Sequence, residues 1–213
     1  ELKKNNDRII YAAVSGFGCY GPKSLRPGYD IIAQATGGLM SITGEPGRHG
    51  IRVGNAMGDV LGGMNLTIGI LIALHARTIT GKGQRVDVSL VDSVVSSLET
   101  GTQRYFASGK QPELMGNRYA AAYPYDSFKA SDGFFVIGCG NDKLFSLFCN
   151  NVLNRPELLE DSRFATNIKR CEYHAELKPI IEEWSINYSI DEAVDLLNEA
   201  GVPAAPINDL QRV

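Results

Sequence analysis

Apolar residues recur at intervals of three and four positions in several segments, the spacing of one face of an α-helix. The longest such pattern begins at Asp59 and continues to about residue 78. Its apolar positions are Leu61, Met64, Ile68, Leu71, Ile72 and the ring carbons of His75. We expect this stripe to be the buried face of a helix. The same spacing predicts helices at residues 29–38, 91–107, 144–152, 157–184 (interrupted near 162–167) and, after a Ser-x-x-Glu capping box, 189–200.

Strand patterns alternate with these helices. Residues 8–15 form a compact apolar run, which is typical of a buried parallel strand, and residues 85–90 show the period-two alternation of a half-buried strand. Up to residue 107 the order is therefore strand, helix, helix, strand, helix. That order predicts an α/β fold.

The character of the chain changes at residue 108. Residues 108–124 are polar, rich in Gly, Pro, Asn and Tyr, and have no period, so we interpret them as a linker. Residues 125–130 and 134–139 flank the turn sequence Ser-Asp-Gly and predict a hairpin. Helices follow the hairpin, and residues 202–207 read as an extended connector. The second part of the chain is therefore expected to be α+β.

Composition and charge narrow the classes of function. The chain has 213 residues and a net charge of −3, which gives no indication of nucleic acid or a membrane surface as a partner. Its longest apolar stretch, residues 68–76, is too short to cross a bilayer. The four cysteines lie far apart without a CxxC pair, and the three histidines are scattered, so we expect neither a metal site nor a disulfide framework. Because the first residue is Glu1 rather than Met, we expect a piece of a longer chain.

Asp59 is the first candidate for chemistry. Unpaired N–H groups and the positive end of the helix dipole stabilise a carboxylate in the first turn of a helix. Asp59 could therefore have a purely structural role. However, Gly54, Gly58, Gly62 and Gly63 surround it, and each glycine weakens a helix start by roughly 1 kcal/mol relative to alanine. Close approach of a ligand or of another backbone would explain the glycines. Both interpretations of Asp59 stay open at this point.

Two glycine-rich loops are further candidates. Residues 16–21 (GFGCYG) match the dinucleotide pattern GxGxxG, but Pro22 and Pro27 frame a polar loop where that pattern needs a helix, so a simple turn is favoured. Residues 138–142 (GCGND) precede a helix and combine small flexible residues with free N–H groups. Such a loop can receive an oxyanion or an acyl group, or it can be a turn in which Asn141 or the next residue caps the helix.

Seven collinear segments of the chain resemble the class III (CaiB/BaiF-type) coenzyme A transferases, and together they span nearly the whole chain. They are SGFGCYGP (15–22), RPGYDIIAQATGGLMSITGEP (26–46), RVGNAMGDVLGGM (52–64), TGKGQRVDVSLVD (80–92), GNRYAAAYPYDSF (116–128), VIGCGNDKLF (136–145) and GVPAAPIN (201–208). The resemblance implies an α/β fold with part of a Rossmann-like large domain and a small α+β domain, which the family assembles as an interlocked dimer.

The resemblance also suggests domain limits. Residues 1–107 match the later part of the large domain, which carries the aspartate, and residues 108–124 the linker. Residues 125–200 match the small domain with its glycine loop, and residues 201–213 a connector that returns toward the large domain. We therefore expect two structural units in this chain.

Roles for individual residues follow from the same resemblance. Asp59 matches the family's nucleophilic aspartate, which forms an acyl-aspartyl anhydride and then an aspartyl-CoA thioester. The implied activity is transfer of CoA from an acyl-CoA donor to a carboxylic acid, with CoA as a substrate and with neither a covalently bound cofactor nor a metal. The residues that match substrate-binding segments are Arg26, Gly28, Tyr29, Asp30, Gly138, Gly140 and Asn141.

Two alternatives to this activity stay open. The α-methylacyl-CoA racemases of the same superfamily abstract an α-proton, and their branch carries His where this chain has Tyr29, whose phenol is a weak match to that role. The chain could also be a non-catalytic dimerisation fragment. We expect acyl-CoA and acid substrates, a homodimer, no nucleic acid or membrane partner, and a location in the cytoplasm or, in a eukaryote, the mitochondrial matrix.

Overall fold

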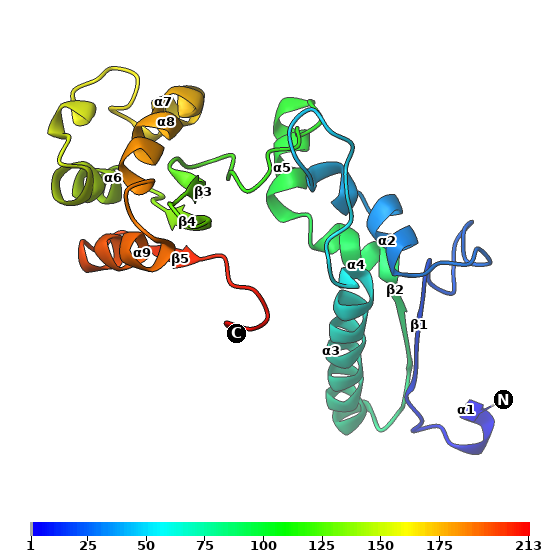
Figure 1. Cartoon of the computed structure of the whole chain (residues 1–213). Coiled ribbons are helices and arrows are strands. Elements are labelled where there is room, and N and C mark those ends of the chain that lie inside the picture. The colour runs from blue at the N-terminus through cyan, green and yellow to red at the C-terminus, as the bar shows by residue number, and fades with distance from the viewer. Residues whose placement is uncertain (1) are drawn as a thin grey trace. The chain divides into compact units, whose positions relative to one another are not determined.

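The structure is a computed structural model that describes residues 2–213, and it confirms the α/β class (Figure 1). Two compact units divide the chain, the first running through Gly116 and the second from Asn117 to Val213. The first contains α1 (Leu2–Asn5), β1 (Tyr11–Ser15), α2 (Asp30–Thr36), η1 (Leu39–Ile42), α3 (Met57–Thr80), β2 (Arg85–Ser89), α4 (Leu90–Ser96) and α5 (Glu99–Ser108). The second contains β3 (Tyr125–Lys129), β4 (Phe134–Gly138), α6 (Asp142–Phe148), η2 (Cys149–Leu153), η3 (Pro156–Leu159), α7 (Asn167–Glu172), α8 (His174–Ser185), α9 (Ile190–Glu199) and β5 (Ala204–Pro206).

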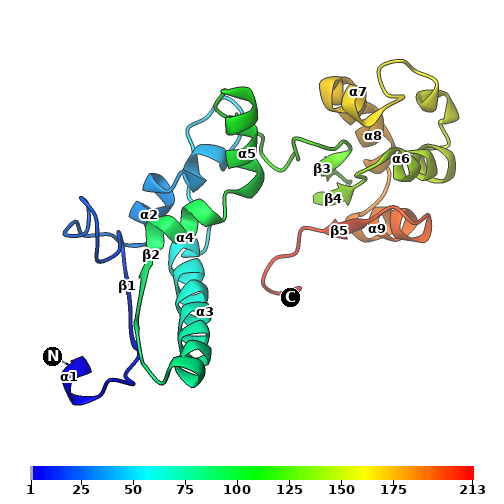
Figure 2. The same ribbon diagram turned by 180° about the vertical axis from the view of Figure 1, so that it is seen from behind.

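In the first unit, β1 and β2 are present as the two predicted strands, and they pair in parallel, with Tyr11 opposite Arg85 and Ser15 opposite Ser89. The long helix α3 runs beside both strands (Figures 1 and 2). The prediction that β1 is buried is wrong, because Tyr11 and Val14 remain exposed. A parallel strand is buried when helices cover both faces of its sheet, and here the cover comes mainly from α3.

The apolar stripe of α3 does not form the buried face that its spacing predicted. Met64, Ile68, Leu71 and Ile72 are all more than half exposed. By length and composition α3 could cross a membrane, although core helices of soluble proteins pass the same test, and 17% of its most apolar window is buried. The uninterrupted apolar stretch, residues 68–76, makes up only part of this helix.

Small residues form the packed face of α3 instead. Gly58, Gly62 and Ala73 are its buried residues. A Cβ atom on Gly62 would lie 2.5 Å from Cδ2 of Leu90, the first residue of α4. A Cβ on Gly69 would likewise lie 2.6 Å from a methyl group of Val86 in β2. Missing side chains therefore let α3 approach its neighbours, which assigns Gly58 and Gly62 to packing within this unit.

The single helix predicted for residues 91–107 is two helices, α4 and α5. At the break, Ser96 Oγ donates to the carbonyl of Ser93 (2.8 Å) and Ser97 Oγ donates to that of Val94 (2.7 Å). Serine side chains that bond to nearby backbone oxygens compete with helix continuation. These local hydrogen bonds of Ser96 and Ser97 therefore interrupt the helix, although the apolar spacing continues.

The second unit is built on an antiparallel sheet in the order β3-β4-β5. The β3–β4 hairpin and the capping box of Ser189 and Glu192 are both confirmed. Within the stretch interpreted as an extended connector, β5 adds to β4, with Ala204 opposite Ile137. The largest fully buried apolar side chains of this unit are Tyr123, Phe128, Phe135, Phe145, Phe148, Phe164, Ile137, Leu177, Ile181 and Leu197.

Residues 108–124, which the sequence indicates as a linker, are divided between the two units. The N–H of Gly116 donates to the carbonyl of Gly44 (2.9 Å) in the first unit. The N–H of Tyr119 donates to the carbonyl of Tyr125 (2.9 Å) in the second. The boundary between the compact units therefore falls inside this irregular segment.

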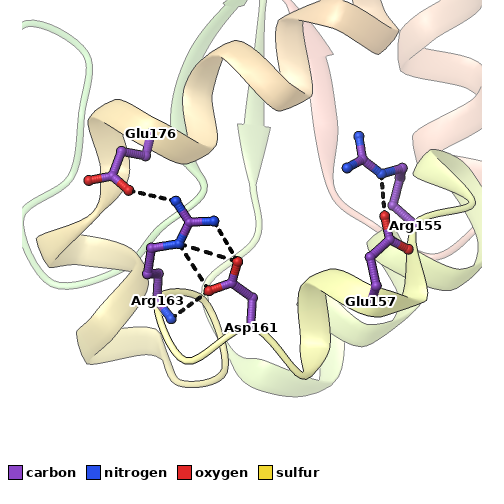
Figure 3. A network of polar contacts seen from close by, with 5 residues as sticks. All are labelled: Arg155, Glu157, Asp161, Arg163 and Glu176. Carbon is purple, nitrogen blue, oxygen red and sulfur yellow. Dashed lines mark hydrogen bonds and ion pairs between the residues drawn. The ribbon is translucent and has the colours of Figure 1, made fainter.

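Several ion pairs lie on the surface of the second unit (Figure 3). Arg163 contacts Asp161 at 2.6 Å and Glu176 at 3.0 Å, and Arg155 pairs with Glu157. These guanidinium groups are solvent-exposed, and exposed pairs contribute little to stability. The aromatic core, rather than this network, holds the unit together.

Candidate functional site

Asp59 lies in the first turn of α3 and is exposed to solvent. Among residues 2–213, no side chain or backbone group forms a hydrogen bond with its carboxylate. The N-cap position belongs to Ala56, which offers no capping side chain. Asp59 therefore stands beside the positive end of a helix dipole with both oxygens available to a ligand.

The cap of α3 comes from α2. Asp30 Oδ1 accepts a 2.7 Å hydrogen bond from the N–H of Gly58, and its Oδ2 accepts one of 2.8 Å from Gln34 Nε2. Gln34 is fully buried; its Oε1 accepts from the N–H of Val53 (2.9 Å) and its Nε2 also donates to the carbonyl of Asn55 (3.2 Å). We call this arrangement the Asp30–Gln34 clamp. It holds the turn that leads into Asp59.

The sequence interpretation placed Asp30 among the substrate-binding residues and missed Gln34. In the structure both oxygens of the Asp30 carboxylate bond to protein groups. The signal for Gln34 was its spacing, because residues four apart on one helix face can hydrogen-bond to each other. Arg52 was also missed, and its guanidinium donates to the carbonyls of Val53 (3.1 Å) and Gly54 (2.8 Å).

The other predicted substrate-binding residues of the first unit lie just before α2. Gly28 packs so closely on Gly16 that a Cβ added to Gly16 would lie 2.6 Å from Gly28 Cα. Gly28 is thus required by the fold itself. Tyr29, at the N-cap position of α2, is 81% exposed, and Arg26 is exposed as well. These two side chains are open to a ligand.

The loop after β1 is a turn, as the sequence favoured over a dinucleotide site. Gly18 and Gly21 have positive φ angles (77° and 87°), and residues 22–26 form further turns rather than a helix. The N–H of Cys19 donates to Asp87 Oδ2 (2.9 Å), and hydrogen bonding from Cys19 lowers the pKa of the Asp87 carboxyl. Without a helix opening on the third glycine, the loop lacks the N–H cluster that binds a pyrophosphate.

In the second unit, the loop of residues 138–142 leads from β4 into α6. Asn141 is the N-cap, and its Oδ1 accepts from the N–H of Leu144 (2.9 Å), so the capping role left open by the sequence is present. The N–H of Gly138 donates to the carbonyl of Pro203 (2.8 Å). Gly140 is exposed.

Neither glycine of this loop is required by the fold of the second unit. Both lie outside the left-handed φ region that favours glycine. A Cβ on Gly138 would make an ordinary 3.7 Å contact with Pro203, and one on Gly140 would meet nothing within 4 Å. The contrast with Gly16 and Gly28 is clear, since a Cβ on either of those would clash with backbone atoms. The loop glycines leave open space.

Buried groups beneath the loop position it without taking part in chemistry. Burial raises the pKa of the Cys139 thiol to about 12, so this cysteine is not a nucleophile near neutral pH. The buried Arg170 guanidinium donates to the carbonyls of Tyr123 (2.8 Å) and Phe164 (2.9 Å) and to Asp142 Oδ1 (2.6 Å). Because Asp142 is the first residue of α6, Arg170 secures the helix that follows the loop.

A pair of alanine substitutions separates structural glycines from open ones. Gly28→Ala is expected to lower the free energy of unfolding of the first unit by about 1–3 kcal/mol, because its Cβ would lie 2.9 Å from Gly16 Cα. Gly140→Ala is expected to change that of the second unit by less than about 0.5 kcal/mol. Thermal unfolding followed by circular dichroism measures both, and equal effects would contradict the distinction.

Among residues 2–213, no group of three or more His, Cys, Asp or Glu side chains could hold a metal ion. The residue before Asp59, Gly58, bonds to Asp30 at the start of α2, and Tyr29 and Arg26 lie on the segment that precedes α2. Gly138, Gly140 and Asn141 belong to the second unit.

Comparisons with known proteins identify the family. A profile of CoA-transferase family III matches residues 1–213. The chain is 41% identical over 211 residues to acetyl-CoA:oxalate CoA-transferase of Acetobacter aceti, covering 99% of this chain and 54% of that protein. It is 36% identical over 213 residues to succinyl-CoA:glutarate CoA-transferase of Mus musculus, covering 100% of this chain and 49% of that protein.

Solved structures agree with these sequence matches. A CaiB/BaiF family protein from Brucella suis superposes with a TM-score of 0.84 at 40% identity, over 99% of this chain and 55% of that one. Rv3272 from M. tuberculosis superposes with a TM-score of 0.85 at 26% identity, over 99% of this chain and 56% of that one. The chain spans about half the length of the relatives it matches. It belongs to CoA-transferase family III, as the collinear segments of its sequence predicted.

Proposed function

We propose that the intact protein transfers CoA from an acyl-CoA donor to a carboxylic acid, with Asp59 as the nucleophile. The observation that carries this proposal is the exposed Asp59 carboxylate, which is bonded to no described group although it stands in the first turn of α3. A carboxylate present only to cap the helix would bond to its N–H groups. Here Asp30 provides that cap, so Asp59 is left for a ligand.

The proposed reaction conserves the free energy of the thioester. The Asp59 carboxylate attacks the donor carbonyl, expelling CoA as a thiolate and forming an acyl-aspartyl anhydride. The thiolate attacks the aspartyl carbonyl of this anhydride, which releases the donor acid and leaves an aspartyl-CoA thioester. The acceptor carboxylate then attacks that thioester, forming a new anhydride and releasing the thiolate again. Attack of the thiolate on the acceptor's acyl carbon yields the new acyl-CoA and regenerates Asp59.

Other residues are proposed to assist through binding. The N–H groups at the start of α3 favour the negative charge of the attacking carboxylate. Tyr29 and Arg26 are exposed side chains on the segment that the resemblance places against CoA, so contacts with acyl-CoA are proposed for them. Gly138 and Gly140 leave room for an acyl group, and the N–H groups of Gly140 and Asn141, which bond to no described group, are candidate donors to a tetrahedral oxyanion.

The substrate class is proposed from the relatives. Their names pair acetyl-CoA or succinyl-CoA with oxalate, glutarate, D-citramalate or mesaconate, all of which are dicarboxylates. We therefore propose a dicarboxylate as donor or acceptor acid, and a panel of acyl-CoA donors against dicarboxylates would identify it. The proposed partners are these substrates and a second copy in a homodimer, without nucleic acid or membrane, in the cytoplasm or a mitochondrial matrix.

Trapping of the covalent intermediates tests the mechanism. Full-length enzyme is incubated with an acyl-CoA donor and hydroxylamine, which converts an aspartyl anhydride or thioester into a hydroxamate. Peptide mass spectrometry is expected to find the hydroxamate on Asp59 only when the donor is present. Modification elsewhere, or none during active turnover, would contradict the assignment.

The racemase alternative predicts a different signal. Such an enzyme exchanges the α-hydrogen of its substrate with solvent deuterium and needs no acceptor acid. The names of the relatives favour transfer. The alternative of a dimerisation fragment concerns the 213-residue chain alone, and size-exclusion chromatography with CoA titration tests it, since tight CoA binding would count against it.

A further inference from the structure

We propose that Asp30 and Gln34 are positioning residues that determine how fast Asp59 reacts. This inference rests on the proposed role of Asp59 as the nucleophile. The clamp joins two elements whose residues the proposed reaction uses: α3, which carries Asp59, and the start of α2, which follows Tyr29. It therefore sets where the carboxylate stands relative to the side chains proposed to contact acyl-CoA.

The targets of the clamp are the first argument. All its bonds to backbone go to residues 53–58, the turn that ends next to Asp59. Gly54, Asn55 and Ala56 in this turn are exposed and add nothing to the apolar core. A fully buried amide such as that of Gln34 loses its hydration, and packing α2 would need only an apolar side chain of similar size. What glutamine provides beyond packing is its hydrogen bonds to Val53 and Asn55, which fix this turn.

The choice of a distant cap is the second argument. A serine or aspartate at the N-cap position would satisfy the first N–H groups of α3 locally. The chain instead has Ala56 there and takes the cap from Asp30, 28 residues earlier. A local cap fixes only the helix start, whereas this one also fixes the position of α3 against α2.

The lack of a side chain at Gly58 permits its close contact with Asp30. A Cβ atom there would lie 3.1 Å from Asp30 Oδ1 and 3.2 Å from the Cβ of Ala33, tighter than ordinary packing. The exposed Arg52 also bonds to this turn, through the carbonyls of Val53 and Gly54. The backbone before the proposed nucleophile is thus held by several side chains, which is how preorganised sites keep a reacting group in place.

Exchanging the two side-chain chemistries gives a test in the full-length enzyme. Gln34→Glu places a carboxylate against that of Asp30 and leaves the Asn55 carbonyl without its donor. Displacement of the reacting group is expected to lower kcat about 100-fold. Asp30→Asn forces an amide against either the Gly58 N–H or the Gln34 amide, and is expected to lower kcat about tenfold. KM for acyl-CoA should change less than about threefold in both, because Tyr29 and Arg26 are intact.

The double variant Asp30→Asn with Gln34→Glu is the decisive measurement. The amide at position 30 can donate to the carboxylate at position 34, while oxygens at both positions still accept from Gly58 and Val53. We expect it to regain at least about tenfold of the kcat lost in Gln34→Glu. A residue needed only for folding would not show this reciprocal rescue. Absence of rescue, with kcat no better than in the worse single variant, would overturn the proposal.

Two further measurements separate positioning from stability and from the proposed function. Val86→Ala removes methyl groups of β2 that pack against Gly69, farther along α3 than the clamp, and at equal loss of melting temperature it should keep normal kcat. Hydrogen exchange of the peptide covering residues 53–58 should be faster in Gln34→Glu and slower again in the double variant. Unchanged hydrogen exchange of residues 53–58 in Gln34→Glu would overturn the proposal, even if both single variants had a lowered kcat. If Asp59→Ala turned over normally, the proposed function would fail while the exchange data still reported on the clamp.

Discussion

Asp59→Asn is expected to lower kcat for CoA transfer by about 10⁴-fold or more, because a neutral amide cannot attack a thioester. The replacement has the same shape. The structure gives the Asp59 carboxylate no hydrogen bond among the described residues, so only its interaction with the helix dipole, about 0.3–1 kcal/mol, is lost and the melting temperature should fall only slightly. Initial rates of acyl-CoA formation in the full-length enzyme, with circular dichroism melting curves, measure both quantities.

A matched control distinguishes chemistry from helix electrostatics. Asp92 is also an exposed first-turn aspartate, at the start of α4, where Ser89 caps the helix. Asp92→Asn removes the same charge from the same kind of position and should leave kcat at the wild-type value. Asp59→Ala guards against slow deamidation of the asparagine. Turnover of Asp59→Ala within about tenfold of wild type would remove Asp59 from the mechanism.

Arg170→Met is expected to destabilise the second unit by about 3–5 kcal/mol. The methionine fills similar volume, but the buried carbonyls of Tyr123 and Phe164 lose their donors. Asp142 loses its partner as well, although its side chain is 64% exposed and stays hydrated. Trp184, the single tryptophan of this chain, packs on the core of this unit and reports its urea unfolding by fluorescence.

Arg163→Met provides the comparison for Arg170. The Arg163 guanidinium contacts two carboxylates but lies on the surface, and its removal should leave the urea midpoint unchanged (Figure 3). A midpoint for Arg170→Met equal to that of Arg163→Met would show that the buried guanidinium has no special structural role. Both residues are arginines with polar partners, so the difference between the two urea midpoints measures how much burial of the guanidinium adds to its effect on stability.

Local signals account for what the sequence could predict of the fold. The Ser-Asp-Gly turn specifies the β3–β4 hairpin, and the Ser189–Glu192 box opens α9 through neighbouring groups alone. Asp59 was placed in the first turn of a helix for the same reason. By contrast, β5 forms by pairing with β4, where Ala204 lies opposite Ile137, almost 70 residues earlier. A strand of three residues is too short for its own sequence pattern to predict it.

The candidate site shows the same division. The sequence by itself determined the family and the position of Asp59, because collinear motifs and helix spacing are readable along the chain. Only the tertiary structure decided which face of α3 is packed, since glycines that permit close approach carry no apolar signal, whereas the exposed Ile68 and Leu71 do. It also assigned Asp30 to the clamp. Whether a carboxylate meets a ligand or a backbone N–H 28 residues away depends on where the fold brings them together.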